Sequence, residues 1–247
     1  MSGLLVVTGA SRGIGRAICE RGLGRGLAVC AVARSADDLA TLAALAPERV
    51  AAVVADVRDA PAVAAGCAAA IGRFGAPTIA VAAAGLLGPI DRPWRLDPAG
   101  LDEALSVTVT GTANLAAATV PAMLEAGRGT FVAVSASSAT RVFPGWAAYG
   151  AAKAGLDALV RHIGEEGGDA LTAFSFVPGL TDTAMQAGLR DVDEERFPMV
   201  GQFRRWHERG ASKDPALVAE ALELALALPR DELHGRIVEA DPLLKRR

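Results

Sequence analysis

The sequence predicts an α/β protein built on a doubly wound, seven-stranded parallel sheet with helices on both faces. Short runs rich in Val, Ile, Ala and Leu recur along the chain. The segments between them carry Ala and Leu at helical spacing with charged outer faces, as residues 215–228 do. This alternation with short connections favours a parallel sheet. The expected strands are residues 4–7, 28–32, 50–55, 78–82, 130–134, 171–177 and 236–238.

The length and composition suit one hydrophobic core. The chain has 247 residues, of which 51% are hydrophobic and 4% aromatic, and this is typical of a sheet covered by Ala-rich helices. No repeat or long linker divides it, so we expect a single domain over residues 1–247. Residues 180–213 mix Met, Phe, Trp and charged residues. We interpret them as an irregular segment that covers a substrate.

Charge and residue usage argue against several function classes. The formal net charge is −3, and Lys and Arg are scattered apart from a basic tail at residues 245–247, so we expect no nucleic-acid partner. The first strand begins too early for a secretion signal, and we expect no membrane-spanning run, no membrane partner and a cytoplasmic protein. The cysteines and histidines lack metal-ligand spacing, so we expect buried free thiols and no metal site.

A glycine-rich loop directly follows the first expected strand. Gly9 permits a tight turn, Gly13 lets the backbone approach a pyrophosphate, and Gly15 allows close helix–strand packing. A helix begins after the loop, and its N-terminal N–H groups favour phosphate binding. The strand–loop–helix context therefore predicts a dinucleotide-binding site. The other loop residues expected to contribute are Ser11, Arg12 and Ile14.

The pattern Thr-Gly-x-x-x-Gly-x-Gly over residues 8–15 resembles the short-chain dehydrogenase/reductase family, and the resemblance extends over nearly the whole chain. It implies a Rossmann fold with strand order 3-2-1-4-5-6-7 and a nicotinamide dinucleotide cofactor. The family's adenine-contacting pair falls on Asp56 and Val57. Its Asn-Asn-Ala-Gly segment reads Ala-Ala-Ala-Gly here, and the resemblance implies that Ala83 and Gly85 contact the cofactor.

The choice between NAD and NADP depends on the end of the second strand. An acidic residue there would bond the adenosine ribose and favour NAD, but this chain has Arg34. Arg12 in the phosphate loop would join Arg34 in binding a 2'-phosphate, because guanidinium groups bind phosphate oxygens bidentately. The alternative is that both are solvated surface arginines. Because the acid is missing and two basic residues are present, we expect NADP(H).

Tyr149 and Lys153 resemble the family's Tyr-x-x-x-Lys motif. Their spacing places both side chains on one face of a helix that begins after the fifth strand and a loop. An ammonium group stabilises a phenolate, so we expect Lys153 to lower the pKa of Tyr149. The resemblance implies that Tyr149 protonates a carbonyl oxygen as hydride arrives at carbon, while Lys153 bonds the nicotinamide ribose.

The family's catalytic Ser and Asn are both altered. The Ser position, thirteen residues before the Tyr, is Ala136, flanked by Ser135 and Ser137. In a regular strand both serines would point away from the side that Ala136 faces, so a replacement needs irregular backbone. We take Ser137 as the candidate catalytic serine; the alternatives are Ser135 or no serine, with both hydroxyls satisfying local backbone groups. The Asn position falls at Thr108.

Two further segments extend the resemblance toward the nicotinamide and the substrate. Residues 178–183 resemble the segment that packs on the nicotinamide carboxamide, which adds Pro178, Gly179, Thr181 and Thr183 to the expected cofactor contacts. Residues 144–149 and 182–186 resemble more narrowly the sepiapterin reductase and bacterial benzil reductase branch. That branch implies aromatic or vicinal-dicarbonyl ketones as substrates. The expected substrate contacts are Trp146, Met185 and Glu239, the last with an ordinary solvated acid as its alternative.

These features predict NADPH-dependent reduction of a ketone or dicarbonyl compound to an alcohol. The resemblance also implies a homodimer or homotetramer that assembles through the helices around Tyr149. The altered Ser and Asn positions leave two alternatives open. One is a non-redox step, such as dehydration or isomerisation, on the same fold, and the other is a protein that binds nucleotide without catalysis. Intact Tyr149 and Lys153 argue against the last.

Overall fold

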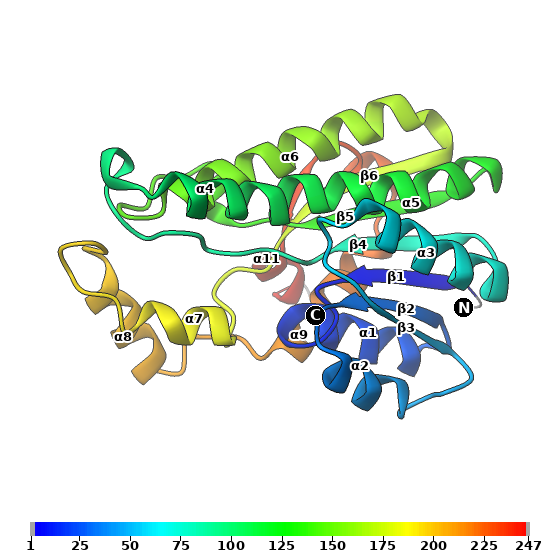
Figure 1. The fold of residues 1–247 in the computed structure, drawn as a ribbon, viewed down its shortest axis with the longest axis horizontal. Helices are drawn as coiled ribbons and strands as arrows, with labels where there is room; N and C mark the ends of the chain where they lie inside the picture. The colour runs from blue at the N-terminus through cyan, green and yellow to red at the C-terminus, as the bar shows by residue number, and fades with distance from the viewer. Residues whose placement is uncertain (1–2, 246–247) are drawn as a thin grey trace.

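All seven strands form one parallel sheet in the computed structural model, which describes residues 3–245 (Figure 1). The order across the sheet is β3-β2-β1-β4-β5-β6-β7. The predicted fold class and strand order are therefore confirmed. The strands are β1 Leu4–Thr8, β2 Ala28–Ala33, β3 Val50–Val54, β4 Pro77–Ala82, β5 Gly129–Val134, β6 Leu171–Val177 and β7 Ile237–Glu239.

Helices cover both faces of the sheet (Figure 1). Because strand side chains alternate between faces, neighbouring residues of β1 enter different cores: Val7 joins one buried cluster and Val6 the other. The helices of the first face are α1 Gly13–Gly24, α2 Ala36–Ala43, α9 Pro215–Leu226 and α11 Ala240–Leu244, with α10 Arg230–Leu233 before β7. Those of the second face are α3 Ala60–Phe74, α4 Pro98–Leu105, α5 Gly111–Glu125 and α6 Ala147–Gly167.

Polar caps fix where several helices begin. The Ser35 hydroxyl accepts a hydrogen bond from the first turn of α2 at 3.3 Å, and the Asp59 carboxylate accepts one from the first turn of α3 at 3.0 Å. Asp214 caps α9 in the same way at 2.7 Å, with Pro215 next to it. Such caps satisfy N–H groups that have no partner within the helix. They therefore set how each chain segment returns from the carboxyl edge of the sheet.

Residues 180–213 project from the carboxyl edge of the sheet (Figure 1). They contain α7 Ala184–Leu189 and α8 Val200–Glu208, so the expectation of an irregular segment is wrong. The physical reason is that Val200 and Phe203 recur at helical spacing and are buried against Trp146. The segment thus has its own small core.

The two ends of this segment meet at one point. The Lys213 N–H donates to the Leu180 carbonyl at 2.9 Å, and the Asp182 N–H donates to the Lys213 carbonyl at 2.8 Å. The Lys213 ammonium also pairs with Asp241 of α11, with 2.5 Å between Nζ and Oδ1. The two ends of the segment are therefore hydrogen-bonded to each other at the point where it leaves and rejoins the sheet.

One helical run is long and apolar enough to cross a membrane. α4, a π-helical turn at Ser106–Thr110 and α5 are continuous over 28 residues, with a mean hydropathy of 1.3 in the most apolar window. The expectation that no such run exists is therefore wrong on length and composition. The run packs against α3, β4 and α6 and buries Leu115 and Met123, as a core helix of a globular protein does.

The three cysteines, Cys19, Cys30 and Cys67, are free and buried, as predicted. Across residues 3–245 no group of three or more His, Cys, Asp or Glu side chains is arranged to hold a metal ion.

Candidate active site

A cavity of about 870 Å³ lies at the carboxyl edge of the sheet. Parallel α/β sheets bind ligands at this edge where the strand order changes direction, which here is between β1 and β4. Most of the residues predicted from the sequence meet in this one cavity. Those that line it are Gly9, Ser11, Arg12, Gly13, Ile14, Gly15, Arg34, Asp56, Val57, Ala83, Gly85, Tyr149, Lys153, Pro178, Thr183 and Met185.

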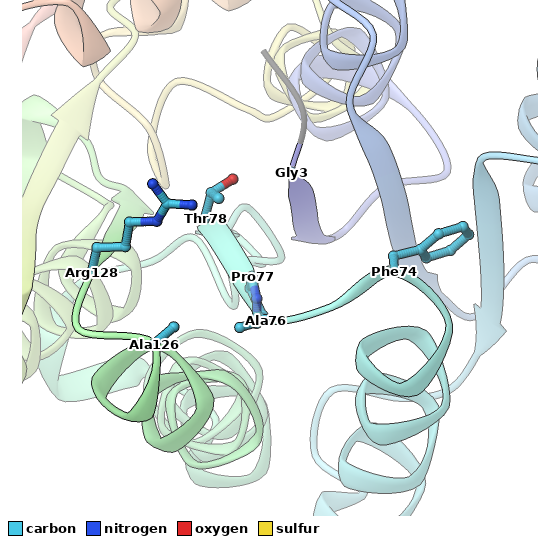
Figure 2. Close-up of a pocket in the computed structure, with 7 residues that line it drawn as sticks. All are labelled: Gly3, Phe74, Ala76, Pro77, Thr78, Ala126 and Arg128. Atoms are coloured by element: carbon cyan, nitrogen blue, oxygen red, sulfur yellow. The ribbon is translucent and has the colours of Figure 1, made fainter.

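A second, smaller cavity of about 280 Å³ lies at the opposite edge, beside the amino ends of β1 and β4 (Figure 2). Arg128 extends toward Thr78 in this cavity, and the Thr78 hydroxyl donates to the Leu4 carbonyl at 3.3 Å. None of the predicted site residues lines it. The larger cavity is therefore the candidate active site.

Two glycines of the loop after β1 lie where a side chain would meet the protein's own backbone. Gly9 has a φ of +67°, and a Cβ at this position would lie 2.8 Å from the Ala84 nitrogen. A Cβ on Gly15 would lie 2.3 Å from the Gly9 carbonyl oxygen, so only glycine lets α1 start this close to β1. The N-terminal N–H groups of α1 face the cavity beyond this loop, and such groups bind phosphate oxygens. The loop thus has the close packing that the sequence predicts for a phosphate-binding turn.

The far end of the cavity carries two exposed arginines, Arg12 and Arg34. Among the residues the structure describes, neither forms an ion pair with a carboxylate. Asp56, by contrast, accepts hydrogen bonds from the Arg58 guanidinium at 3.0 and 2.8 Å. This pairing, with a smaller contribution from Arg34, lowers the pKa of Asp56 to about 2. The two unpaired guanidinium groups remain free to meet an anion.

Tyr149 and Lys153 stand one turn apart at the start of α6. The Lys153 ammonium donates to the Val134 carbonyl at 2.6 Å, and its nitrogen lies 5.7 Å from the centroid of the Tyr149 ring. Lys153 is only 3% exposed. Burial lowers its pKa to about 8, against the opposing effect of the Asp157 carboxylate. At neutral pH the ammonium form therefore predominates.

The expectation that Lys153 lowers the pKa of Tyr149 is wrong for this structure. Burial raises the pKa of Tyr149 to about 12, because a phenolate loses hydration in the partly buried site. Tyr149 is therefore a protonated donor at neutral pH, as an acid catalyst for reduction must be.

Thr108, at the family's Asn position, lies in the π-helical turn between α4 and α5 and is fully buried. Its hydroxyl has no hydrogen-bond partner within residues 3–245. A Cβ built on Gly85 would lie 3.3 Å from Lys153 Nζ and 3.7 Å from Thr108 Oγ1. Both polar groups thus converge on Gly85, and π-helical turns of this kind are frequent at functional sites.

Of the serines that follow β5, Ser135 lines the cavity and Ser137 does not. Ser135 continues the strand, since its N–H donates to the Phe176 carbonyl at 2.8 Å, and its side chain is 1% exposed with an unpartnered hydroxyl in the described chain. The chain then turns, and Ser137 begins a short 3₁₀ helix at Ser137–Ala139. The backbone is irregular here, as a replacement for Ala136 requires. The role of Ser137 stays a prediction.

Two predicted cofactor contacts lie beside the cavity and not on its wall. Thr181 is 3% exposed, and its hydroxyl donates to the Gly179 carbonyl at 3.2 Å. A Cβ on Gly179 would lie 2.8 Å from the Lys213 ammonium. These residues support the path between Pro178 and Thr183, both of which line the cavity.

Two predicted substrate contacts also lie off the cavity wall. Trp146 is 8% exposed and belongs to the aromatic cluster under the 180–213 segment. Glu239 is an exposed residue that ends β7 directly before α11. Met185 does line the cavity. Their substrate roles stay predictions.

Sequence reasoning missed several residues of the cavity wall. Leu86 and Leu87 line it, and their signal was their position after the loop that follows β4. Asp38 lines it from the first turn of α2, three residues beyond the Ser35 cap. Val107 lines it from the π-helical turn, and no sequence pattern indicated that turn.

Comparison with known proteins agrees with this geometry. Benzil reductase ((S)-benzoin forming) of Bacillus subtilis is 28% identical over 256 residues, covering 98% of this chain and 99% of that protein. The crystal structure of the KRED1-Pglu enzyme is 31% identical with a TM-score of 0.89 and covers 96% of this chain and 100% of that one. Actinorhodin polyketide ketoreductase, solved with NADPH, is 26% identical with a TM-score of 0.85, covering 96% and 95%.

The family model for short chain dehydrogenase matches residues 4–194. This match takes in the glycine-rich loop, the cavity wall after β4 and the Tyr149–Lys153 pair. The chain therefore belongs to the short-chain dehydrogenase family of oxidoreductases.

Proposed function

We propose that this oxidoreductase uses NADPH to reduce a ketone or dicarbonyl compound to an alcohol. The observation that carries the proposal is one continuous cavity with the Tyr149–Lys153 pair at one end and the unpaired Arg12 and Arg34 at the other. A bound nicotinamide supplies the hydride in this chemistry. The protein's part is to hold both reactants and to supply the proton.

Tyr149 is assigned the proton transfer. Its hydroxyl is protonated at neutral pH because burial raises its pKa to about 12. As a carbonyl oxygen gains negative charge, the hydroxyl donates its proton to that oxygen. Lys153 lies behind the ring and keeps positive charge close to the oxygen that is left on Tyr149. The ammonium stabilises the phenolate only at the moment when it forms.

NADPH is the proposed cofactor because the adenosine end of the cavity is basic. Arg34 takes the place of the acid that would bond a ribose hydroxyl. Both arginines are exposed and unpaired within the described chain, so binding of a 2'-phosphate would not require existing ion pairs to break. Actinorhodin polyketide ketoreductase was solved with NADPH, which supports the same choice.

The substrate class follows from the apolar wall near the catalytic pair. Leu86, Leu87 and Met185 line the cavity, and Leu87 packs with Tyr149 against the cluster around Trp146. Apolar walls of this kind select hydrophobic and aromatic groups. Together with the similarity to benzil reductase, this favours aromatic ketones and vicinal dicarbonyl compounds.

The experiment is a panel of aromatic ketones and vicinal dicarbonyl compounds with NADPH, followed by the loss of absorbance of the reduced cofactor. We expect turnover with the parent protein and none with Tyr149→Phe, while both bind NADPH with similar affinity. Equal turnover by the two proteins would show that another acid operates. Binding of NADPH without turnover of any compound would favour a nucleotide-binding protein. Product formation without NADPH oxidation would favour a non-redox step, which the altered Ala136 and Thr108 positions motivate.

The cytoplasmic location and the homodimer or homotetramer expected from the sequence remain part of this proposal. Light scattering on the purified protein measures the second directly.

A further inference from the structure

A buried carboxylate lies one helical turn beyond Lys153. Asp157 is 4% exposed, and neither of its side-chain oxygens has a hydrogen-bond partner among residues 3–245. Leaving a charged group buried and unpartnered is costly, so such groups are paired or serve a function. Neither the proton transfer assigned to Tyr149 nor the ribose contact implied for Lys153 involves Asp157.

Arg161 follows Asp157 by one helical turn but is exposed, so Lys153 is the buried positive charge next to Asp157 on α6. Side chains four residues apart lie on the same face of a helix, and both side chains belong to the buried stripe of α6. The two form no ion pair in the described chain, since neither Asp157 oxygen has a partner there, and Lys153 Nζ donates to the Val134 carbonyl. They interact through a low-dielectric interior, in which charges act over longer distances than in water.

The elements packed on this stripe bring no other buried charge next to Lys153 or Asp157: His234 lies beside Gly164, about two turns beyond Asp157, and Asp169 is exposed. β5, β6 and the π-helical turn contain no titratable side chain, and the 3₁₀ turn at Ser137–Ala139 contains none. The acids of α4, Asp102 and Glu103, are exposed, as is Glu125 at the end of α5. The titratable neighbours of Lys153 are therefore Tyr149 and Asp157.

We propose that Asp157 is a positioning residue whose buried negative charge holds Lys153 in its charged form behind Tyr149. The inference deepens the proposed function and rests on the role assigned to Lys153 there. The inference also bears on the family's Asn position, which is altered in this chain. The family's Asn position, which is Thr108 here, offers a hydroxyl in place of an amide, and Asp157 supplies electrostatic support to the ammonium.

The electrostatics agree with this geometry. Burial lowers the pKa of Lys153 to about 8, and Asp157 is the group that raises it. Without that carboxylate the pKa would fall further, and a larger fraction of Lys153 would be neutral at physiological pH. A neutral amine stabilises a phenolate poorly, so Asp157 acts through Lys153 and not on the substrate.

The test is a direct titration of Lys153, which is one of three lysines in the chain, with Lys213 and Lys245. Protein labelled with ¹⁵N at the lysine side chains is titrated by NMR, and the Lys153 signal is assigned by its loss in Lys153→Met. We expect Asp157→Asn to move the midpoint for Lys153 about one pH unit or more toward acid, a tenfold change in the protonation ratio. Glu165→Gln, on an exposed position of the same helix, should leave it unchanged. An unchanged midpoint in Asp157→Asn would overturn the proposal.

A second measurement covers the case in which Asp157→Asn does not fold well. Lys153→Met leaves Asp157 as a lone buried charge, so we expect Lys153→Met/Asp157→Asn to melt at a higher temperature than Lys153→Met alone. Additive effects of the two substitutions would mean that the side chains are not coupled, and the proposal would fail. Neither measurement uses turnover. Failure of the proposed function would appear in the NADPH assay and not in these titrations or melts.

Discussion

Trp146 lies edge-on to Tyr149, with ring centroids 5.5 Å apart and ring planes at 83°, and its own ring stacks on Phe197 at 5.5 Å and 6°. A single indole thus touches both the predicted acid catalyst and the 180–213 segment that projects over the cavity. The position of that segment and the orientation of the Tyr149 ring are therefore mechanically linked.

The first prediction tests this link through Phe197→Ala. Phe197 is fully buried, and loss of a buried aromatic ring costs about 3 kcal/mol or more. Because its ring joins the segment to Trp146, we expect faster protease cleavage between residues 180 and 213 and a higher KM, with the unfolding of the sheet little changed. Trp206→Ala, whose recorded ring contact is with Phe203 alone, is the control and should have a smaller effect. Equal cleavage rates of the parent protein and Phe197→Ala would show that the Phe197 ring does not fix the position of the segment.

The second prediction concerns Arg34, at the end of β2. Parent protein should bind NADPH at least about tenfold tighter than NADH, a difference of about 1.4 kcal/mol. Arg34→Asp should narrow or invert this preference, because a carboxylate repels a 2'-phosphate and accepts a hydrogen bond from a ribose hydroxyl. Fluorescence titration with both cofactors measures it, with Arg128→Ala, at the opposite edge of the sheet, as a control for general loss of charge. Identical dissociation constants in the parent protein would contradict the assignment of NADP(H).

The third prediction separates the two serines beside Ala136. Ser135 lines the cavity, and its hydroxyl has no partner among residues 3–245, so Ser135→Ala should lower turnover by about a hundredfold if this hydroxyl contacts the substrate oxygen. Ser137→Ala should be the milder change. The opposite order would support the candidate taken from the sequence, and Ala136→Ser should raise turnover if no serine acts. The measurement is kcat for the three variants with one carbonyl substrate.

The fourth prediction is an alkaline limit on activity. The pKa of Lys153 is about 8, and deprotonation removes the charge that stabilises the Tyr149 phenolate. The rate of carbonyl reduction should therefore be full below this value and fall as pH rises through about 8. A profile of kcat/KM from pH 6 to about 10 measures it. A rate that stays level across this range would mean that the charge of Lys153 is not needed.

Local patterns and the family resemblance together predicted the fold and most of the cavity wall. The glycine-rich loop after β1 and the i, i+4 pair on α6 each rest on short-range geometry, and each appears in the structure where the pattern indicates. Strand order followed from the resemblance and the same alternation of strands and helices. Side chains at strand ends are brought together by the topology alone, which is why Asp56 and Ala83 meet in one cavity.

What could not be predicted depends on long-range packing. The pKa of Tyr149 is set by how deeply α6 is buried, and sequence reasoning considered only the neighbouring ammonium. The helices within residues 180–213 form because Val200 and Phe203 find partners around Trp146, more than fifty positions earlier in the chain. The π-helical turn that places Val107 and Thr108 has no simple sequence signature.

The hydrogen bonds that join the two ends of the 180–213 segment have an evolutionary consequence. Because Leu180 and Lys213 are neighbours in space, the path of the chain from β6 into α9 does not depend on what lies between them. Insertions or deletions there would cost little closure entropy and would leave the sheet undisturbed. The segment can thus change in length and sequence while the sheet is kept, and the contacts of Trp146 carry such changes to the Tyr149 ring.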